Sequence, residues 1–414
     1  MSGTAFLDKL LEGRTVELVS LDKSSFFEIA NRGRKPVKAS LREPGDTPYY
    51  GANNIQDHVE GHTHDGEYVL IAEDGSKSLE HYSIQYVNGK FWANNHVHVV
   101  RGTDGVDTRF LYHSLCIFNF IPLLSGGGRA KLTKARLQEV TIPIPCPNDR
   151  EKSLAIQAEI VRILDNFTTL EAELEAELEA RRRQYQHYRD ALLTFGDPDT
   201  MTASKQARIG WKTLDDLCLN VSSGGTPRAT RPEYYGGDIP WLRTQEVRFM
   251  DIYDTDKRIT EKGLAESSAK WIPENCVIVA ISGATAARSA INKISLTTNQ
   301  HCCNLQVDPE VANYRYVFHW VSKEYEKLKA LGQGARSDLN SGIIKSYPIP
   351  VPYPDDPEKS IAEQDRIVSI LDKFDALVND LTDGLPAEIN ARRKQYEYYR
   401  DQLLTFPQAE EAVA

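Results

Sequence analysis

The feature that most constrains this chain is a long helical sequence that occurs twice. Residues 153–195 carry apolar side chains in heptad steps, interrupted by Glu171 and Arg181. The apolar seam consists of Ile160, Leu164, Phe167, Leu174, Leu178, Tyr185, Tyr188, Leu192 and Phe195. This spacing predicts a coiled-coil helix. Residues 360–406 repeat it, and the copies end in RRRQYQHYRDALLTF and RRKQYEYYRDQLLTF, so the chain divides into two similar halves.

The sequence between the helices repeats as well. The proline-rich segments Ile142–Pro147 and Ile349–Pro354 match at an offset of 207, and the offset becomes 211 near the helix ends. Alternate prolines predict an extended segment that cannot continue a helix or lie in a central strand. We therefore expect globular domains at 1–150 and 205–355, and long helices at 151–196 and 358–407.

Each globular domain has the pattern of a strand-rich α/β fold. Tyr68–Ala72 predicts a buried strand, Ser83–Trp92 a hairpin with an Asn-Gly turn, and Arg109–Phe120 a helix. Cys276–Ile281 and Tyr314–Leu331 predict the corresponding strand and helix of the second half. The predicted class is α+β, with two similar domains separated by two long antiparallel coiled-coil helices in a pseudo-two-fold arrangement.

The start of the chain resembles the end of each long helix. Phe6–Leu11 is similar to Asp190–Leu193 and to Asp401–Leu404. A chain that begins where a repeat ends is circularly organised. We therefore expect both termini to meet near one end of the helix pair.

The composition limits the class of protein. The 414 residues carry a formal net charge of −10, which argues against a protein that binds nucleic acid through a uniformly basic surface. Six cysteines without CxxC spacing predict buried thiols rather than a metal site. The sequence has no run of 18 apolar residues and no signal-peptide core, so we expect a cytoplasmic protein without a membrane segment.

Two like domains on two like helices present two similar surfaces at a set distance. A helix of 43 residues is ~64 Å long, comparable to roughly 19 base pairs of duplex DNA. A ruler for DNA is therefore dimensionally possible. The alternatives are a coiled-coil adaptor that joins two protein-binding domains without DNA recognition, and an enzyme with both functions in one chain.

The duplicated helix ends, the EAELEAEL tetrad repeat between them, and the IPIPCP and IPVPYP segments carry a family resemblance. Over its full length the chain resembles the specificity subunit of type I restriction-modification enzymes, and the type IC group in particular. The resemblance implies that residues 1–150 and 205–355 are target-recognition domains, each reading one half of a bipartite site in double-stranded DNA.

The same resemblance implies the partners. The helices are expected to set the spacer between the half-sites and to dock two adenine-N6 methyltransferase subunits, to which restriction and translocase subunits are added. S-adenosylmethionine, ATP and Mg are then expected on the partner subunits, and no cofactor on this chain. It would be a non-catalytic specificity subunit.

Missing motifs agree with that expectation. The sequence contains no GxxxxGK[ST] phosphate loop and no Asn/Asp-Pro-Pro-aromatic tetrad. Glu73, Asp74 and Lys77 have nuclease-like chemistry, and His96 and His98 alternate like a metal pair, but both sets are more typical of ordinary structure. We predict neither a catalytic nor a metal site.

The strongest candidate for DNA contact is Ser125–Arg136, where three glycines precede a cluster of basic residues in an acidic protein. Arg and Lys neutralise phosphate or read guanine, and Asn and Gln read adenine. The predicted DNA-binding residues are Arg129, Lys131, Lys134, Arg136, Arg336, Asn340, Lys345, Arg243, Gln245, Arg248, Thr285, Arg288, Asn53, Asn54, Gln56, Arg34 and Lys35. The same residue types are also common on turns and solvated surfaces.

Two positive runs recur on the helices. We predict partner docking at Arg181, Arg182, Arg183, Arg392, Arg393 and Lys394, because two copies of one partner need two like surfaces. A charge run on a helix is also commonly a solvated face. The neighbouring tyrosines lie on the seam, so core packing explains them. Near the four extra residues of the second helix, Gly384 and Pro386 predict a kink.

Overall fold

A computed structural model describes residues 7, 9–126, 130–195, 209–332, 338–380 and 382–406. The chain forms two compact units, residues 1–173 with 389–414 (unit 1) and residues 174–388 (unit 2). The long helix α4, Arg150–Leu192, crosses the boundary between them.

Unit 1 contains three antiparallel or mixed sheets, ordered β1-β10, β2-β9-β6-β7 and β4-β3-β8-β5. Its strands are β1 (Val16–Ser20), β2 (Phe27–Ile29), β3 (Pro44–Tyr50), β4 (Ile55–Val59), β5 (His64–Asp65), β6 (Tyr68–Ala72), β7 (Ile84–Val87), β8 (Lys90–Ala93), β9 (Val97–Gly102) and β10 (Thr141–Pro145). Its helices are α2 (Thr108–Cys116), α3 (Lys134–Gln138), the first part of α4 and most of α11 (Leu385–Leu404), with short 3-10 turns η1 (Asn31–Gly33), η2 (Ala39–Leu41) and η3 (Ile121–Leu123).

The predicted strand Tyr68–Ala72 is confirmed as β6, but the predicted hairpin Ser83–Trp92 is wrong. Gly89 has a positive φ of 90°, but Asn88 does not have the positive φ that a type I′ turn also requires. The strands on either side of it separate, because β7 pairs with β6 whereas β8 pairs with β3 and β5. The turn therefore carries the chain from one sheet to another.

Unit 2 repeats this plan, with sheets ordered β11-β21, β12-β20-β17-β18-β14 and β15-β13-β19-β16. Its strands are β11 (Ile209–Thr213), β12 (Cys218–Ser223), β13 (Tyr235–Leu242), β14 (Asp251–Ile252), β15 (Arg258–Ile259), β16 (Trp271–Ile272), β17 (Val277–Ala280), β18 (Ser289–Asn292), β19 (Leu296–Thr298), β20 (Cys302–Val307) and β21 (Pro348–Pro352). Its helices are α6 (Glu261–Ala265), α7 (Tyr314–Lys323), α8 (Tyr325–Ala330), α9 (Ser341–Lys345), α10 (Pro357–Asn379) and the last part of α4, and its 3-10 turns are η4 (Asp215–Leu217), η5 (Pro232–Tyr234), η6 (Thr244–Glu246) and η7 (Gly283–Thr285).

The proline-rich segments are confirmed as extended and peripheral. Each lies in a two-stranded antiparallel sheet, where β10 pairs with β1 and β21 pairs with β11. A two-stranded sheet leaves one side of each strand unpaired, so the missing proline N–H groups cost no ladder bond.

The predicted helix Tyr314–Leu331 is two helices, α7 and α8, which are separated at Glu324. The Glu324 carboxylate is buried and bonds to Lys323, Lys327 and the hydroxyl of Tyr347. An inward-turned carboxylate with three donors thus lies at the point where the helix breaks.

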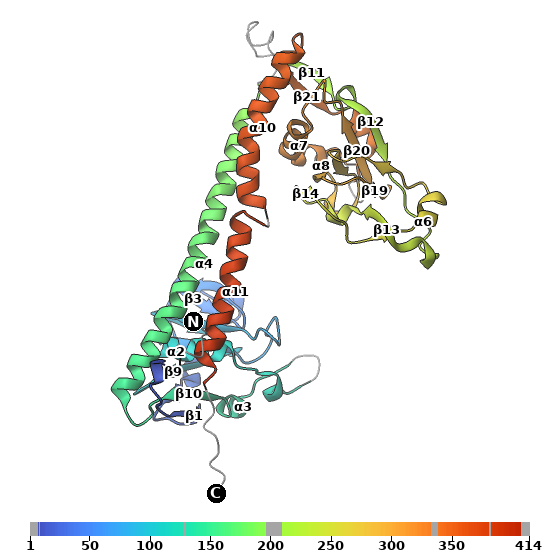
Figure 1. The fold of residues 1–414 in the computed structure, drawn as a ribbon. Helices are drawn as coiled ribbons and strands as arrows, with labels where there is room; N and C mark the ends of the chain where they lie inside the picture. Colours follow the sequence, from blue (N-terminus) through green and yellow to red (C-terminus); the bar gives the residue numbers. More distant parts are fainter. Residues whose placement is uncertain are drawn as a thin grey trace. The chain divides into compact units, whose positions relative to one another are not determined.

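The long helices run antiparallel within each unit (Figure 1). In unit 1, Phe167 of α4 lies against Tyr396 and Tyr399 of α11 at 6.4 and 5.4 Å between ring centroids. In unit 2, Tyr185 and Tyr188 of α4 lie against Phe374 of α10 at 6.4 and 5.1 Å. The tyrosines therefore pack on the seam, as predicted.

The second long helix is interrupted rather than merely kinked. α10 ends at Asn379 and α11 begins at Leu385. A Cβ at Gly384 would lie 2.6 Å from the carbonyl oxygens of Ala376 and Asp380, so only glycine allows the chain to turn this tightly here.

The expected meeting of the chain ends is seen in the core of unit 1. Leu7 and Leu11 are buried in the same apolar cluster as Leu403 and Leu404, together with Leu164 of α4. The first helical residues therefore complete the core that the last helix leaves open.

Candidate nucleic-acid interface

One polar cluster fastens each globular domain to the long helices. In unit 1, Asp165 of α4 accepts hydrogen bonds from Arg109 Nε at 2.9 Å and His113 Nε2 at 2.8 Å, both on α2. The hydroxyl of Tyr396 lies 3.4 Å from the other imidazole nitrogen. We call these four residues the helix anchor of unit 1.

Unit 2 contains the same anchor. Asp372 of α10 contacts Arg315 Nε at 2.6 Å and His319 Nε2 at 2.7 Å, both on α7. The hydroxyl of Tyr185 lies 3.2 Å from His319 Nδ1. Because the contacts recur with the same geometry, each domain is held on its helix in the same way.

The environment of each helix anchor shifts the pKa values of its ionisable side chains. Burial alone would raise the pKa of Asp165 and of Asp372, but hydrogen bonds from the neighbouring histidine and arginine hold both pKa values below the ordinary range. Burial lowers the pKa of His113, and the Asp165 carboxylate offsets only part of this effect. Asp165 is therefore ionised at neutral pH while His113 is neutral.

Three loop segments meet in unit 1, and two of them carry predicted DNA-binding residues. The loop after β3 meets the loop after β6, because Asn53 Nδ2 donates to Gly75 O at 2.9 Å and Asn53 Oδ1 accepts from Lys77 N at 3.0 Å. The segment before α3 joins them through a bridge between Asp74 and Lys131. These three segments form the loop cluster of unit 1.

A partly buried carboxylate lies beside this loop cluster. Glu73 contacts Arg34 Nη1 at 2.6 Å and Lys131 Nζ at 3.0 Å. Burial raises the pKa of Glu73, but these two donors outweigh it and lower the pKa overall. Glu73 is thus a structural carboxylate that compensates two of the predicted DNA-binding cations.

The other candidates of unit 1 are more exposed. Lys134 and Arg136 lie on α3, where Arg136 pairs with Glu139 at 2.8 Å. Asn54 and Gln56 are exposed at and after the loop that follows β3. Lys35 is also exposed, with Nζ 5.6 Å from the centroid of the Trp92 ring.

The candidates of unit 2 converge in the same way. The turns η6 and η7 contact each other, which brings the segment of Arg243, Gln245 and Arg248 beside that of Thr285 and Arg288. Gln245 and Arg248 are exposed, and Arg248 Nε donates to Gln245 O at 2.9 Å. These segments belong to the loop cluster of unit 2.

The segment before α9 completes this cluster. Gly283 N donates to Asp338 Oδ1 at 3.1 Å, and Leu339 N donates to Ile281 O at 2.8 Å. Asn340 is exposed and caps α9 by accepting from Ile343 N, whereas Lys345 pairs with Asp215 at 3.1 Å. Arg129 and Arg336 lie outside the described residues.

Strand pairing shows which residues of the two clusters correspond. β3 runs parallel to β8 with Tyr50 opposite Ala93, and β13 runs parallel to β19 with Leu242 opposite Thr298. Counted from these pairs without a gap, Asn53 aligns with Gln245 and Gln56 aligns with Arg248, although Gln56 lies on β4 and Arg248 follows η6. The positions recur while the side chains differ.

The positive runs on the helices are partly paired. Arg181 Nε contacts Glu177 at 2.7 Å and Arg183 contacts Glu179 at 3.3 Å within α4. Arg393 Nε contacts Glu171 of α4 at 2.5 Å, and Arg392 donates to Gln395. The remaining members of the two runs, Arg182 and Lys394, are exposed.

The described part of the chain offers no group of three or more His, Cys, Asp or Glu side chains that could hold a metal ion. His98 Nε2 lies 2.7 Å from Leu132 O, and His96 Nδ1 lies 2.8 Å from Asp74, so both histidines serve packing and hydrogen bonding. Within the same residues, no helix is long and apolar enough to cross a membrane.

Known proteins share this sequence and fold. The family described as type I restriction modification DNA specificity domain matches residues 17–180 and 209–391. A putative type I restriction enzyme specificity subunit of Haemophilus influenzae is 41% identical over 412 residues, which cover 97% of this chain and 98% of that protein. A type I restriction enzyme specificity subunit of Escherichia coli is 34% identical and covers 99% of both chains.

Solved structures agree at the level of the fold. The crystal structure of a type I restriction-modification S subunit from M. genitalium matches with a TM-score of 0.62 at 14% identity, over 96% of this chain and 98% of that one. A chain from a structural study of complex assembly in the type I R-M system matches with a TM-score of 0.50 at 15% identity, over 91% and 97%.

Two units with like anchors, each matched by a DNA specificity domain, make this a duplicated DNA specificity protein. The chain belongs to the family of type I restriction-modification specificity subunits, with one specificity domain in each half. It is a non-catalytic subunit that recognises DNA, and the adaptor alternative is set aside.

Sequence reasoning missed two functional features. It did not identify the helix anchors, although Arg109, His113 and Asp165 recur as Arg315, His319 and Asp372 at offsets of 206 and 207. That recurrence was a usable signal. Sequence reasoning also did not predict the ion pairs of Glu73 with Arg34 and Lys131, because these residues come together only in the tertiary structure.

Proposed function

We propose that each loop cluster reads one half of a bipartite site in double-stranded DNA, and that the long helices set the spacer between the halves. The observation that carries this proposal is the contrast between the anchors and the clusters. The anchors recur residue for residue, whereas Asn53 and Gln56 of one cluster align with Gln245 and Arg248 of the other. Two domains that are anchored alike but carry different residues in their loop clusters fit the recognition of two different half-sites.

The chemistry of the differing residues fits base reading. Asn and Gln bond bidentately to adenine, and Arg bonds bidentately to guanine. The Asn53 side chain is hydrogen-bonded to the backbone of Gly75 and Lys77, so it positions its loop. The side chains of Asn54, Gln56, Gln245 and Arg248 are exposed. We assign base contacts first to these four residues.

The cations near each cluster fit phosphate contact. Lys134 is exposed at the first position of α3, while Lys131, Arg136 and Lys345 are each paired with a carboxylate. A paired cation contributes less to counterion release than a free one. Among the described basic residues of the Ser125–Arg136 segment, Lys134 is therefore the leading candidate for a phosphate contact.

The duplicated helices fit two copies of one partner. We propose that the runs at Arg181–Arg183 and Arg392–Lys394 dock two adenine-N6 methyltransferase subunits, and that restriction and translocase subunits join through them. S-adenosylmethionine, ATP and Mg would then be held by the partners. The site of action proposed for this assembly is the cytoplasm, where DNA, ATP and S-adenosylmethionine are present together.

Reconstitution tests the proposal. The purified chain with S-adenosylmethionine should methylate no adenine, and addition of a separate methyltransferase subunit should produce methylation at one bipartite sequence. Methylated-adenine sequencing of the host genome with and without this gene should show the same sequence. Methyl transfer by the single chain, or an unchanged set of methylated sites without the gene, would contradict the proposal.

A further inference from the structure

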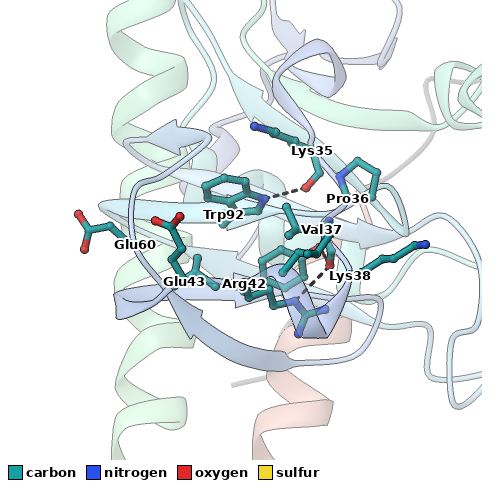
Figure 2. A pocket seen from close by; sticks show the side chains of 11 residues that line it. Lys35, Pro36, Val37, Lys38, Arg42, Glu43, Glu60 and Trp92 are labelled. Carbon is teal, nitrogen blue, oxygen red and sulfur yellow. Dashed lines mark hydrogen bonds between the residues drawn. The ribbon is translucent and has the colours of Figure 1, made fainter.

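Unit 1 contains a cavity of about 510 Å³, lined by residues of the 35–43 segment, by residues of β3, β4 and β8, and by Glu60, none of which belongs to the loop cluster. The residues that line it include Lys35, Lys38, Arg42, Glu43, Glu60 and Trp92 (Figure 2). Its volume lies in the range of small-molecule sites. This cavity has no part in the DNA recognition that we propose for the loop clusters.

An aromatic wall forms one side of the cavity. Trp92 stacks with Tyr49 at 6.3 Å between ring centroids, and its Nε1 donates to Lys35 O at 2.7 Å (Figure 2). Tyr49 is only 2% exposed, so the partly exposed Trp92 ring is the one that meets a ligand. The hydrogen bond to Lys35 fixes the orientation of the indole ring.

Charged groups of both signs surround this wall. Lys35 Nζ lies 5.6 Å from the Trp92 ring centroid, and Lys38 is exposed on the same segment. The side chains of Lys38, Glu43 and Glu60 form no ion pair with any other described residue. Arg42 differs from them, because it stacks on Tyr49 at 4.1 Å and pairs with Asp57 at 3.2 Å.

This combination matches one ligand chemistry. Aromatic rings stack on nucleobases, which is worth about 1–3 kcal/mol per base. Lys ammonium groups bind phosphate as point charges, and carboxylates accept hydrogen bonds from exocyclic amino groups of bases. We propose that this cavity binds a nucleotide, with the base against Trp92, the phosphate at Lys35 and Lys38, and the base edge toward Glu43 or Glu60.

The corresponding residues of unit 2 are buried. Trp92 corresponds to Thr297, which is fully buried, and Tyr49 corresponds to Trp241, which is 5% exposed. Trp241 Nε1 donates to Gly225 O at 2.9 Å. Gly225 corresponds to Lys35, because Gly225 N donates to Thr298 O and Lys35 N donates to Ala93 O, the equivalent strand residue of unit 1. A partly exposed tryptophan at this place in the sheet is therefore a feature of unit 1 that unit 2 does not repeat.

The nucleotide could come from two sources, a free nucleotide in solution or an unpaired nucleotide of bound DNA. Trp92 is the sole tryptophan of unit 1, since the other four are Trp211, Trp241, Trp271 and Trp320. Its fluorescence therefore reports on the cavity. The free-nucleotide measurement needs no DNA recognition, so its failure is distinguishable from failure of the proposed function.

The experiment titrates the full chain with the four deoxynucleoside monophosphates, with a duplex that has one extrahelical nucleotide, and with the fully paired duplex. Quenching by monophosphates with a dissociation constant of about 1 mM or tighter assigns the free nucleotide. Quenching only by the duplex with the extrahelical nucleotide assigns DNA. Trp92→Phe should abolish the fluorescence quenching. Calorimetry then measures whether this variant still binds the nucleotide.

Two matched charge reversals decide the site. Lys38→Glu should weaken binding at least about tenfold, because it replaces an unpaired cation at the cavity. Lys90→Glu, an exposed lysine on the same strand as Trp92 but outside the cavity, should leave binding unchanged. No quenching by any of the nucleotide probes, or equal binding by both variants, would overturn the proposal.

Discussion

His319 Nε2 lies 2.7 Å from Asp372 Oδ1, which joins helix α7 of unit 2 to the long helix α10. The same contact joins α2 to α4 in unit 1, where His113 Nε2 lies 2.8 Å from Asp165 Oδ1. A recognition surface is useful as one end of a ruler only if it cannot rotate on its helix. These contacts supply that constraint in both halves.

Removal of the carboxylate should loosen the domain from its helix. Asp372→Ala removes the acceptor that Arg315 and His319 share, while Arg315 keeps its contacts with Asp251 and Asp375. Because His319 loses its carboxylate partner, we expect a loss of about 2 kcal/mol in the free energy of unfolding of unit 2. Hydrogen exchange in α7 and α10 should rise accordingly. Lys373→Ala, an exposed neighbour on the same helix, is the control. Equal exchange in both variants would show that the anchor does not hold the domain.

Unit 1 should lose stability on mild acidification. Burial lowers the pKa of both His98 and His113 below that of an unfolded histidine, which is about 6.5. Below that pH the unfolded chain binds more protons than the folded unit, so the stabilisation present at pH 7.5 is lost as pH falls, with a slope of up to about 1.4 kcal/mol per pH unit for each histidine.

Hydrogen exchange of the β6 and β9 strands at pH 7.5, 6.5 and 5.5, corrected for intrinsic rates, measures this loss. His98→Gln keeps a side chain that can bond to Leu132 O and should flatten the profile. Identical protection at pH 7.5 and 5.5 in the unmodified chain would contradict the assignment of neutral, buried histidines.

The repeat and the helices could be predicted because their signals are local and occur twice. The error at Ser83–Trp92 has a different origin. The Asn-Gly turn was correctly predicted to need a positive φ at Gly89, but pairing of β7 with β6 and of β8 with β3 is a property of the whole fold. Local chemistry therefore predicted the positive φ of Gly89 and could not predict which strands pair.

The candidate site shows the same division. The residues Arg243–Arg248 and Ser282–Arg288 were recognisable separately by their chemistry, but their meeting through η6 and η7 joins segments about 40 residues apart. The compensation of Arg34 and Lys131 by Glu73 was also hidden, because a lone carboxylate in sequence has no visible partner. DNA contact by the individual residues stays a prediction.

The salt dependence of DNA binding should identify the phosphate contacts. Joint replacement of Arg129, Lys131, Lys134 and Arg136 by alanine in the assembled complex should make the plot of log K against log salt shallower, by ~0.9 for each lost contact. Lys134→Ala alone should account for one contact, because the neighbouring Lys131 and Arg136 already meet carboxylates. An unchanged slope in the quadruple variant would mean that this segment does not touch phosphate.

Docking of partners should depend on equivalent residues of the two helices. Arg183 corresponds to Lys394 at the offset of 211. Arg183→Glu and Lys394→Glu should each remove one methyltransferase subunit from the complex, and the double variant should remove both. Native mass spectrometry counts the subunits. Lys373→Glu is a charge-matched control, and full occupancy in the double variant would assign these runs to a solvated face.

The ruler is tested most directly by a map of methylated adenines for chains with one tetrad fewer or one more in Leu170–Glu177. Each change shifts the remainder of the helix by ~6 Å along its axis and rotates it by only ~40°, while the anchors are untouched. We predict that both half-sites stay the same and that the spacer changes by about one base pair, since a step is 3.4 Å and bending absorbs part of the shift. Active variants that keep the original spacer in both cases would contradict the ruler.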